Sequence, residues 1–137
     1  MATAKVTYTG DLGTEAVHLK SGTKIITDAP VDNNGLGRSF SPTDLVATAL
    51  GSCILTIMGI KARDKDIDIV GATVDINKIM GSGPRRIEII EVEIIMPANG
   101  YTDKERKLLE AAAHHCPVGN SLAEGTEVLS IKWLDDE

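Results

Sequence analysis

The sequence predicts a single α+β domain over residues 1–137, with the element order β-β-β-α-β-β-α-α-β. Along the sequence, groups of strand-like segments precede and follow one long apolar helix, instead of alternating with helices one by one. With 42% hydrophobic and 25% charged residues, a chain of 137 residues can bury one core of its own. Both observations favour one compact mixed domain.

Three short strands are expected in the first 30 residues, at 5–9, 16–20 and 23–27. Glycine- and serine-containing turns separate them. The segment from Asp28 to Phe40 is rich in Gly, Asp, Asn and Pro, which are turn-forming residues. It is interpreted as a loop, which either connects two elements or handles a substrate.

A long helix is expected from Ser41 to about Arg63. Ser41 can cap the first turn, Pro42 suits the first helical position, and Asp44 completes a capping box near the positive end of the helix dipole. Because this helix is apolar on all sides, it is predicted to be the central helix of the core. Its uncharged run is shorter than the ~20 residues that span a bilayer, so no membrane partner is expected.

The second half of the chain is expected to form two strands, two helices and a last strand, at residues 71–78, 87–96, 102–115, 117–123 and 126–134. In the second strand the apolar alternation changes parity at Ile89 and Ile90, which indicates a β-bulge. Thr102 and Glu105 form a second capping box at the start of the amphipathic helix.

The charge pattern excludes several classes of partner. The net charge is −6, no basic block occurs, and only four residues are aromatic, so a nucleic-acid surface is not expected. The chain has no phosphate-binding glycine loop and no dinucleotide motif, so no cofactor is expected. Because the first residues do not resemble a signal peptide, the cytoplasm is the expected location, where cysteines rest as thiols.

The two cysteines lie in different settings, and together they suggest a two-thiol redox site. Cys116 precedes Pro117; as the cap of the short helix, its sulfur would face free backbone N–H groups that favour the thiolate. Cys53 lies in the middle of the long helix, where burial alone would raise the pKa of a thiol. A functional Cys53 therefore needs a cation from outside its helix, and Arg38 is the nearest candidate. The alternative is that both cysteines are packing residues and Arg38 is a solvated charge.

Two further groups were weighed for chemistry. His114 and His115 adjoin Cys116, but adjacent helical residues point about 100° apart, so no metal site is expected. Asp44 is a candidate acid or base, although capping already explains it. It lies on the opposite helix face from Cys53, so the two do not meet within one helix.

Residues 37–53, GRSFSPTDLVATALGSC, resemble the signature of the OsmC/Ohr family. Residues 115–118, HCPV, resemble the second cysteine motif of that family. The resemblance covers essentially the whole chain and implies an OsmC-like fold. In that fold a long central helix is wrapped by antiparallel sheets in an intertwined homodimer, with two active sites at the interface.

The resemblance also implies a thiol-dependent peroxidase that reduces organic hydroperoxides, with hydrogen peroxide as a second candidate substrate. Cys53 would become a sulfenic acid and Cys116 would condense with it to a disulfide. A dithiol reductant, often of the lipoyl type in the family, would restore both thiols. The alternative is a non-catalytic dimer of the same fold that binds a small apolar or electrophilic ligand between its subunits.

The family's site also contains an arginine and a carboxylate. The arginine corresponds to Arg38, which the resemblance implies would stabilise the Cys53 thiolate. The glutamate of the best-studied branches falls on Thr43 here, and the adjacent Asp44 resembles the acid of the more divergent OsmC-like branch. Cys53, Cys116, Arg38 and Asp44 are therefore the predicted site residues.

Overall fold

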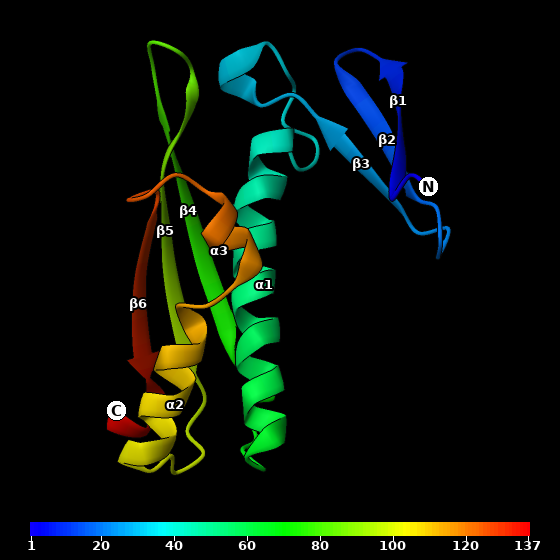
Figure 1. Ribbon diagram of the computed structural model, residues 1–137. Coiled ribbons are helices and arrows are strands. Elements are labelled where there is room, and N and C mark those ends of the chain that lie inside the picture. Colours follow the sequence, from blue (N-terminus) through cyan, green and yellow to red (C-terminus); the bar gives the residue numbers. More distant parts are fainter. The chain divides into compact units, whose positions relative to one another are not determined.

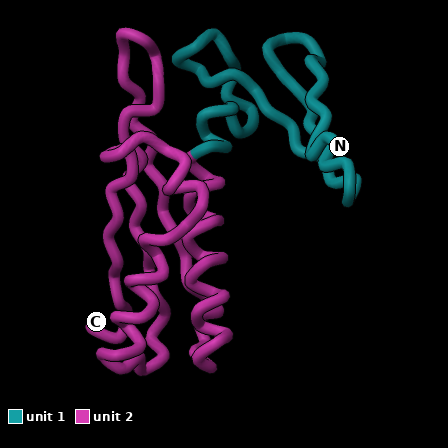
Figure 2. Tube along the Cα trace, in the orientation of Figure 1, with its two compact units in different colours: residues 1–46 teal, residues 47–137 magenta.

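The computed structural model describes residues 1–137, and it divides into two compact units, residues 1–46 and 47–137 (Figure 2). The elements follow the predicted order, with short 3-10 turns added at Val31–Asn33 and Leu134–Asp136 (Figure 1). The α+β class is confirmed. The single-domain organisation stays a prediction, and each unit is described by itself.

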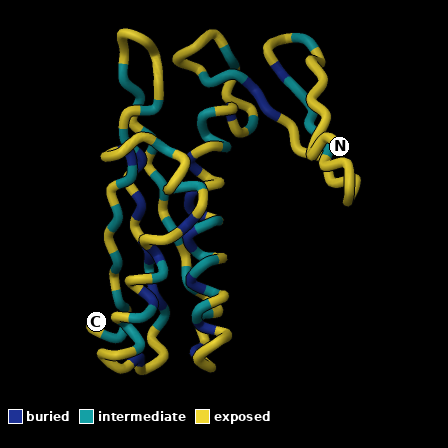
Figure 3. Tube along the Cα trace, viewed as in Figure 1, coloured by how far each residue is buried: buried dark blue, intermediate teal, exposed yellow.

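The first unit is built on a three-stranded antiparallel sheet, in the order β1 (Ala4–Gly10), β2 (Gly13–His18) and β3 (Lys24–Asp28). Few of its side chains are buried within the chain (Figure 3). Large apolar residues lie exposed on β1, on β3 and in the turns beside β2: Val6, Tyr8, Leu12, Leu19, Ile25 and Ile26. Burial concentrates at the end of β3, where Thr27 and Asp28 are less than a tenth exposed.

Helix α1 (Pro42–Asp64) begins with the predicted capping box. The Ser41 Oγ accepts the Asp44 N–H at 3.0 Å, and the Asp44 carboxylate accepts the Ser41 N–H at 3.0 Å. The helix buries one stripe at intervals of about one turn: Ala47, Leu50, Ile54, Met58 and Ala62. Val46 and Ile60 remain exposed, so the chain by itself does not cover every side of α1.

By length and composition, α1 is one helix that could cross a membrane. A core helix of a globular domain passes the same test, and α1 packs its buried stripe into such a core. Length and composition therefore do not decide its environment.

The second unit contains a three-stranded sheet in the order β4 (Thr73–Gly81), β5 (Arg86–Met96) and β6 (Glu127–Trp133). Strands β4 and β5 form an antiparallel hairpin, but β5 and β6 pair in parallel. The expectation of purely antiparallel sheets is therefore wrong for this pair. The reason is the connection between β5 and β6. Helices α2 (Asp103–Ala113) and α3 (Pro117–Ser121) carry the chain back toward the N-terminal end of β5, so β6 starts there and runs in the same direction.

The predicted bulge is present in β5, but slightly earlier than expected. Ile79 pairs with Ile89 and Met80 pairs with Ile87, so Glu88 is the extra residue. The bulge lets Ile87 and Ile90 both face inward despite their odd spacing. The capping box of α2 is confirmed, since Thr102 Oγ1 accepts the Glu105 N–H at 3.1 Å and Glu105 accepts the Thr102 N–H at 2.9 Å.

The core of the second unit lies between this sheet and helices α1 and α2 (Figures 1 and 3). Its fully buried large side chains come from all of these elements: Leu50, Ile54, Met58, Ile90, Ile94, Met96 and Leu109.

Replacing Ile94 by alanine is expected to lower the free energy of unfolding by about 2–5 kcal/mol, because a fully buried side chain leaves a cavity. The matched control is Val128→Ala on the exposed face of neighbouring β6, with an expected loss under about 1 kcal/mol. Urea unfolding of both variants gives the comparison. Equal losses would contradict the assignment of the core.

Candidate active site

Cys116 lies between α2 and α3 and caps the short helix α3, as predicted. Its Sγ accepts the Gly119 N–H at 3.1 Å, and Pro117 occupies the first helical position. The residue is only 2% exposed. A single thiol is thus held at a helix start and is almost fully removed from water.

The environment of Cys116 nevertheless favours the protonated thiol. Burial raises the pKa of Cys116, and the hydrogen bond from the Gly119 N–H only partly opposes this. The expectation that the cap makes Cys116 a thiolate is therefore corrected. The physical reason is that α3 has five residues, so one N–H group and a short dipole act against nearly complete desolvation.

Cys53 lies beside Cys116 within one chain. It is half-buried on α1, next to the buried stripe. A charge on Cys53 raises the pKa of Cys116 further. The structure therefore brings the two predicted thiols close enough for one to affect the pKa of the other.

Glu127 is a third group at this site that the sequence analysis missed. It is the first residue of β6, on the same strand face as Leu129, Ile131 and Trp133, which pack against the core. Its charge raises the pKa of Cys116, and its Oε1 is buried without a hydrogen-bond partner. The sequence does contain a sign of this site. In β6 the inward positions alternate with exposed ones, and Glu127 is an acid at an inward position.

Gly119 allows Glu127 and Cys116 to approach each other. A Cβ on Gly119 would lie 2.7 Å from the Glu127 Oε2 and 3.3 Å from the Cys116 Sγ. Both atoms therefore lie close to the position where any other residue at 119 would place its Cβ. The lack of a side chain at position 119 keeps a carboxylate beside the thiol.

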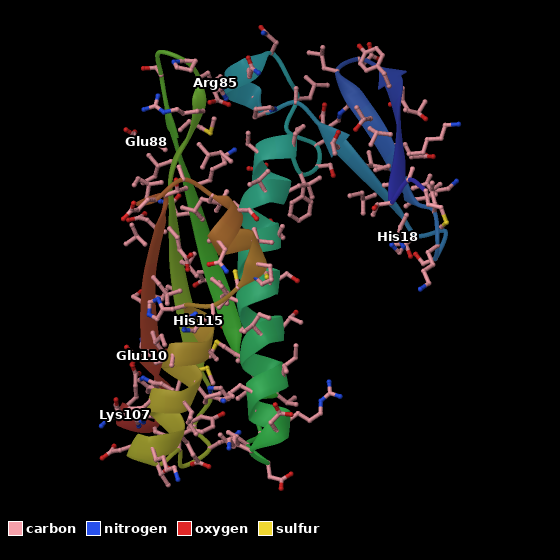
Figure 4. All side chains as sticks on the ribbon, viewed as in Figure 1. His18, Arg85, Glu88, Lys107, Glu110 and His115 are labelled. Atoms are coloured by element: carbon pink, nitrogen blue, oxygen red, sulfur yellow. The ribbon has the colours of Figure 1, made fainter.

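A mostly apolar groove of about 320 Å³ runs between α1 and α2. Ile57 lies in its wall, one helical turn after Cys53, and His115, the residue before Cys116, also lines it (Figure 4). The remaining walls come from the two helices: Ile60, Lys61, Asp64, Leu108, Ala111 and Ala112. The groove can hold a small apolar group, and two of its lining residues follow Cys53 by one turn or precede Cys116 directly.

Arg38 has its partner inside the first unit. Its Nε donates to the Asp28 Oδ2 at 2.9 Å, and its backbone N–H donates to the same oxygen at 3.0 Å. The Asp28 side chain is 4% exposed, whereas that of Arg38 is 59% exposed. The hydrogen bonds from Arg38 hold the pKa of Asp28 below its ordinary value. Asp28 thus anchors a guanidinium that still points to the surface.

The loop before Arg38 is shaped by Gly35. A Cβ at that position would collide with the carbonyl group of Ala29, so only glycine fits. The Gly35 N–H donates to the Pro30 carbonyl at 2.9 Å, and the Gly37 N–H donates to the Ala29 carbonyl at 3.3 Å. This folded loop returns the chain to Asp28. Sequence spacing alone did not identify Asp28 as the partner.

The other candidate residues have simpler surroundings. The carboxylate of Asp44 caps α1, as described above. His114 and His115 are exposed, and no group of three or more His, Cys, Asp or Glu side chains is arranged to hold a metal ion. The thiol pair and Glu127 are therefore the chemically distinctive groups of the second unit.

Comparison with known proteins shows what the chain is similar to. The model of the OsmC-like protein family matches residues 35–130. No curated protein sequence matches the chain. A solved Psychrobacter arcticus structure, named for osmotic stress induction and a detoxification response, is 48% identical with a TM-score of 0.88. The match covers 97% of this chain and 96% of that one.

Two more distant structures share the fold. The organic hydroperoxide resistance protein OsmC of Legionella pneumophila is 18% identical, with a TM-score of 0.68 and 97% coverage of both chains. An organic hydroperoxide resistance protein of Elizabethkingia anophelis is 20% identical, with a TM-score of 0.70. That match covers 97% of this chain and 96% of the other.

Replacing Cys53 by serine is expected to lower the pKa of Cys116, because the charge of Cys53 raises it. Alkylation of Cys116 by iodoacetamide, followed by mass spectrometry across a pH series, measures the change. The profile should shift to lower pH in Cys53→Ser and stay in place in Ser52→Ala, a neighbouring exposed position. An unshifted profile in Cys53→Ser would show that the two sulfurs do not interact.

Replacing Asp28 by asparagine is expected to remove one acid-sensitive contribution to stability. The pKa of Asp28 is lower in the folded protein than the ~3.9 of an unfolded chain, so its contribution is complete above that value. It is lost as the pH falls through the lowered pKa. The stability difference between parent and Asp28→Asn, from urea unfolding at several pH values, should therefore shrink in acid. A difference that does not change with pH would rule out the ion pair.

Proposed function

Because the chain belongs to the OsmC-like protein family, we propose that it is a thiol-dependent peroxidase that reduces organic hydroperoxides. The observation that carries this proposal is that Cys53 packs against the buried cluster that contains Cys116, near enough to raise the pKa of Cys116, within one chain. A disulfide needs the two Cα atoms within about 7 Å, and the proposal requires Cys53 and Cys116 to meet this limit. The names of the Legionella and Elizabethkingia proteins support organic hydroperoxides as the substrate class.

Cys53 is the attacking sulfur in this proposal. Cys53 is half-buried whereas Cys116 is almost fully buried, so Cys53 is the sulfur that a peroxide can reach from outside the core. The Cys53 thiolate attacks one peroxide oxygen and the O–O bond breaks. The alkoxide takes up a proton and leaves as the alcohol, while Cys53 becomes a sulfenic acid.

Cys116 then resolves the sulfenic acid. Its sulfur attacks the Cys53 sulfur, the S–O bond breaks, and the hydroxide leaves as water after taking up a proton. The product is a Cys53–Cys116 disulfide. A dithiol reductant, with the lipoyl type as our candidate, reduces this bond by thiol–disulfide exchange and becomes the cyclic disulfide.

The groove between α1 and α2 supports an organic substrate over hydrogen peroxide. Its walls are mostly apolar, and it begins one helical turn from Cys53. An alkyl or aryl group gains free energy when it leaves water for such a surface, whereas hydrogen peroxide has no apolar part to bury.

Arg38 is the proposed cation of the assembled site, and Asp28 is its anchor. The buried Asp28 carboxylate accepts one hydrogen bond from the Arg38 guanidinium, which orients it, and one from the Arg38 backbone N–H. Asp28 thus takes the place of the carboxylate expected at position 43 or 44. Asp44 stays the cap of α1 and takes no step in this mechanism.

The proposal includes a homodimer in the cytoplasm. The sheet of the first unit and one side of α1 expose apolar residues, among them Val6, Ile26 and Ile60. A second copy would cover such surfaces. A reducing compartment would return both cysteines to thiols after each turnover.

The groove also supports a second candidate function. A non-catalytic dimer could hold a small apolar or electrophilic ligand there, with His115 and Lys61 at its edge. In that function neither thiol reacts with a peroxide.

The test is the reaction of the reduced protein with one equivalent of cumene hydroperoxide. We expect rapid loss of both free thiols and their return with dihydrolipoamide. Cys53→Ser should lose the reaction, and Cys116→Ser should stop at a sulfenic acid that dimedone traps. Arg38→Ala and Asp28→Asn should slow the loss, whereas Arg86→Ala, which changes another exposed arginine, should not.

Two results would contradict the proposal. Peroxide consumption by Cys53→Ser at the parent rate would assign the attack to another group. No thiol loss within minutes would favour the ligand-binding function instead.

A further inference from the structure

The resolving step needs a proton acceptor beside Cys116. The thiolate is the nucleophilic form of cysteine, and Cys116 is almost fully buried, which favours the thiol. In the reduced protein the neighbouring Cys53, as a thiolate, can accept the proton of the Cys116 thiol. Once Cys53 is oxidised it is no longer a thiolate, so another acceptor is required at that moment.

Glu127 has the position and the free capacity for this task. Its Oε2 and the Cys116 Sγ lie against the same side of Gly119, within 2.7 and 3.3 Å of the position that a Cβ would take. Its Oε1 is buried and has no hydrogen-bond partner. An ionised carboxylate only accepts hydrogen bonds, so the unpartnered oxygen is an acceptor without a donor.

The other polar groups considered near Cys116 do not fit the role of proton acceptor. The Gly119 N–H is a donor and already points at the sulfur. His114 and Glu124 are exposed and line, together with Glu127, a surface pocket of about 270 Å³. That pocket connects the carboxylate to solvent, so a proton taken up by Glu127 has a way out.

We propose that Glu127 is the general base that deprotonates Cys116 when it attacks the oxidised Cys53, an inference that rests on the proposed function. The Cys116 S–H bond breaks and Glu127 takes the proton, while the Cys116 electron pair forms the S–S bond. The hydroxide released from Cys53 takes up a proton and leaves as water. Glu127 returns its own proton to solvent through the pocket.

A purely electrostatic role for Glu127 makes the opposite prediction. The negative charge raises the pKa of Cys116, so removing it would increase the thiolate fraction and speed the attack. Removal of a general base slows the attack instead, typically by about 10²-fold or more. The sign of the effect therefore separates the two roles.

The test uses a mixed disulfide in place of the sulfenic acid, so that it does not depend on peroxide chemistry. Ellman's reagent places thionitrobenzoate on Cys53 in mildly acidic buffer, where resolution is slow. After a jump to neutral pH, Cys116 attacks Cys53 and releases thionitrobenzoate, which is followed by its absorbance. We expect Glu127→Gln to slow this release about 10²-fold, and the rate to recover as rising pH supplies hydroxide.

Two variants serve as controls. Glu127→Asp keeps the carboxylate, so its release rate should lie between the parent and Glu127→Gln. Glu124→Gln removes the exposed acid of the same pocket and should release at the parent rate.

An unchanged or faster release in Glu127→Gln would overturn the inference while leaving the peroxidase proposal intact. Failure of cumene hydroperoxide to oxidise Cys53, with a slow release in Glu127→Gln, would reject the peroxidase proposal and keep Glu127 as the base of a thiol–disulfide exchange site.

Discussion

The close packing of α1 against the sheet of the second unit is the constraint on which the thiol site depends. Gly51 makes it possible, because a Cβ there would lie 2.7 Å from the Ile76 Cδ1 and 3.3 Å from the Val74 Cγ1. The same stretch of α1 reaches α3, since the Leu50 Cδ1 would be 3.6 Å from a Cβ on Gly119. Two glycines therefore bring Cys53, Cys116 and Glu127 into one small volume.

Within that volume, burial and charge both act on Cys116. Cys116 is buried against a carboxylate and next to Cys53, and each of these raises the pKa of Cys116. The single N–H of Gly119 opposes them only in part. The helix start thus orients the Cys116 sulfur more than it ionises it, which fits a resolving thiol that reacts second.

The first unit is ordered by a folded loop and an ion pair more than by a buried core. Its sheet buries little within the chain, yet the loop that follows is folded tightly around Gly35 and anchored by the ion pair of Asp28 and Arg38. A buried acid that orients an exposed arginine is a costly arrangement for a mere connection, because a carboxylate loses hydration when it is buried. This favours the interpretation of residues 28–40 as a functional loop over a simple connection.

The sequence by itself determined the element order, both capping boxes, the cap at Cys116 and the family, because these depend on neighbours within a few residues or on a continuous motif. It did not determine the parallel pairing of β6, the partner of Arg38 or the place of Glu127. Each of these depends on contacts between segments far apart in the chain, such as Asp28 with Arg38 across a folded loop. Only the tertiary structure could show that an acid on β6 lies near the thiol that caps α3, since strand alternation gives the face but not what lies opposite.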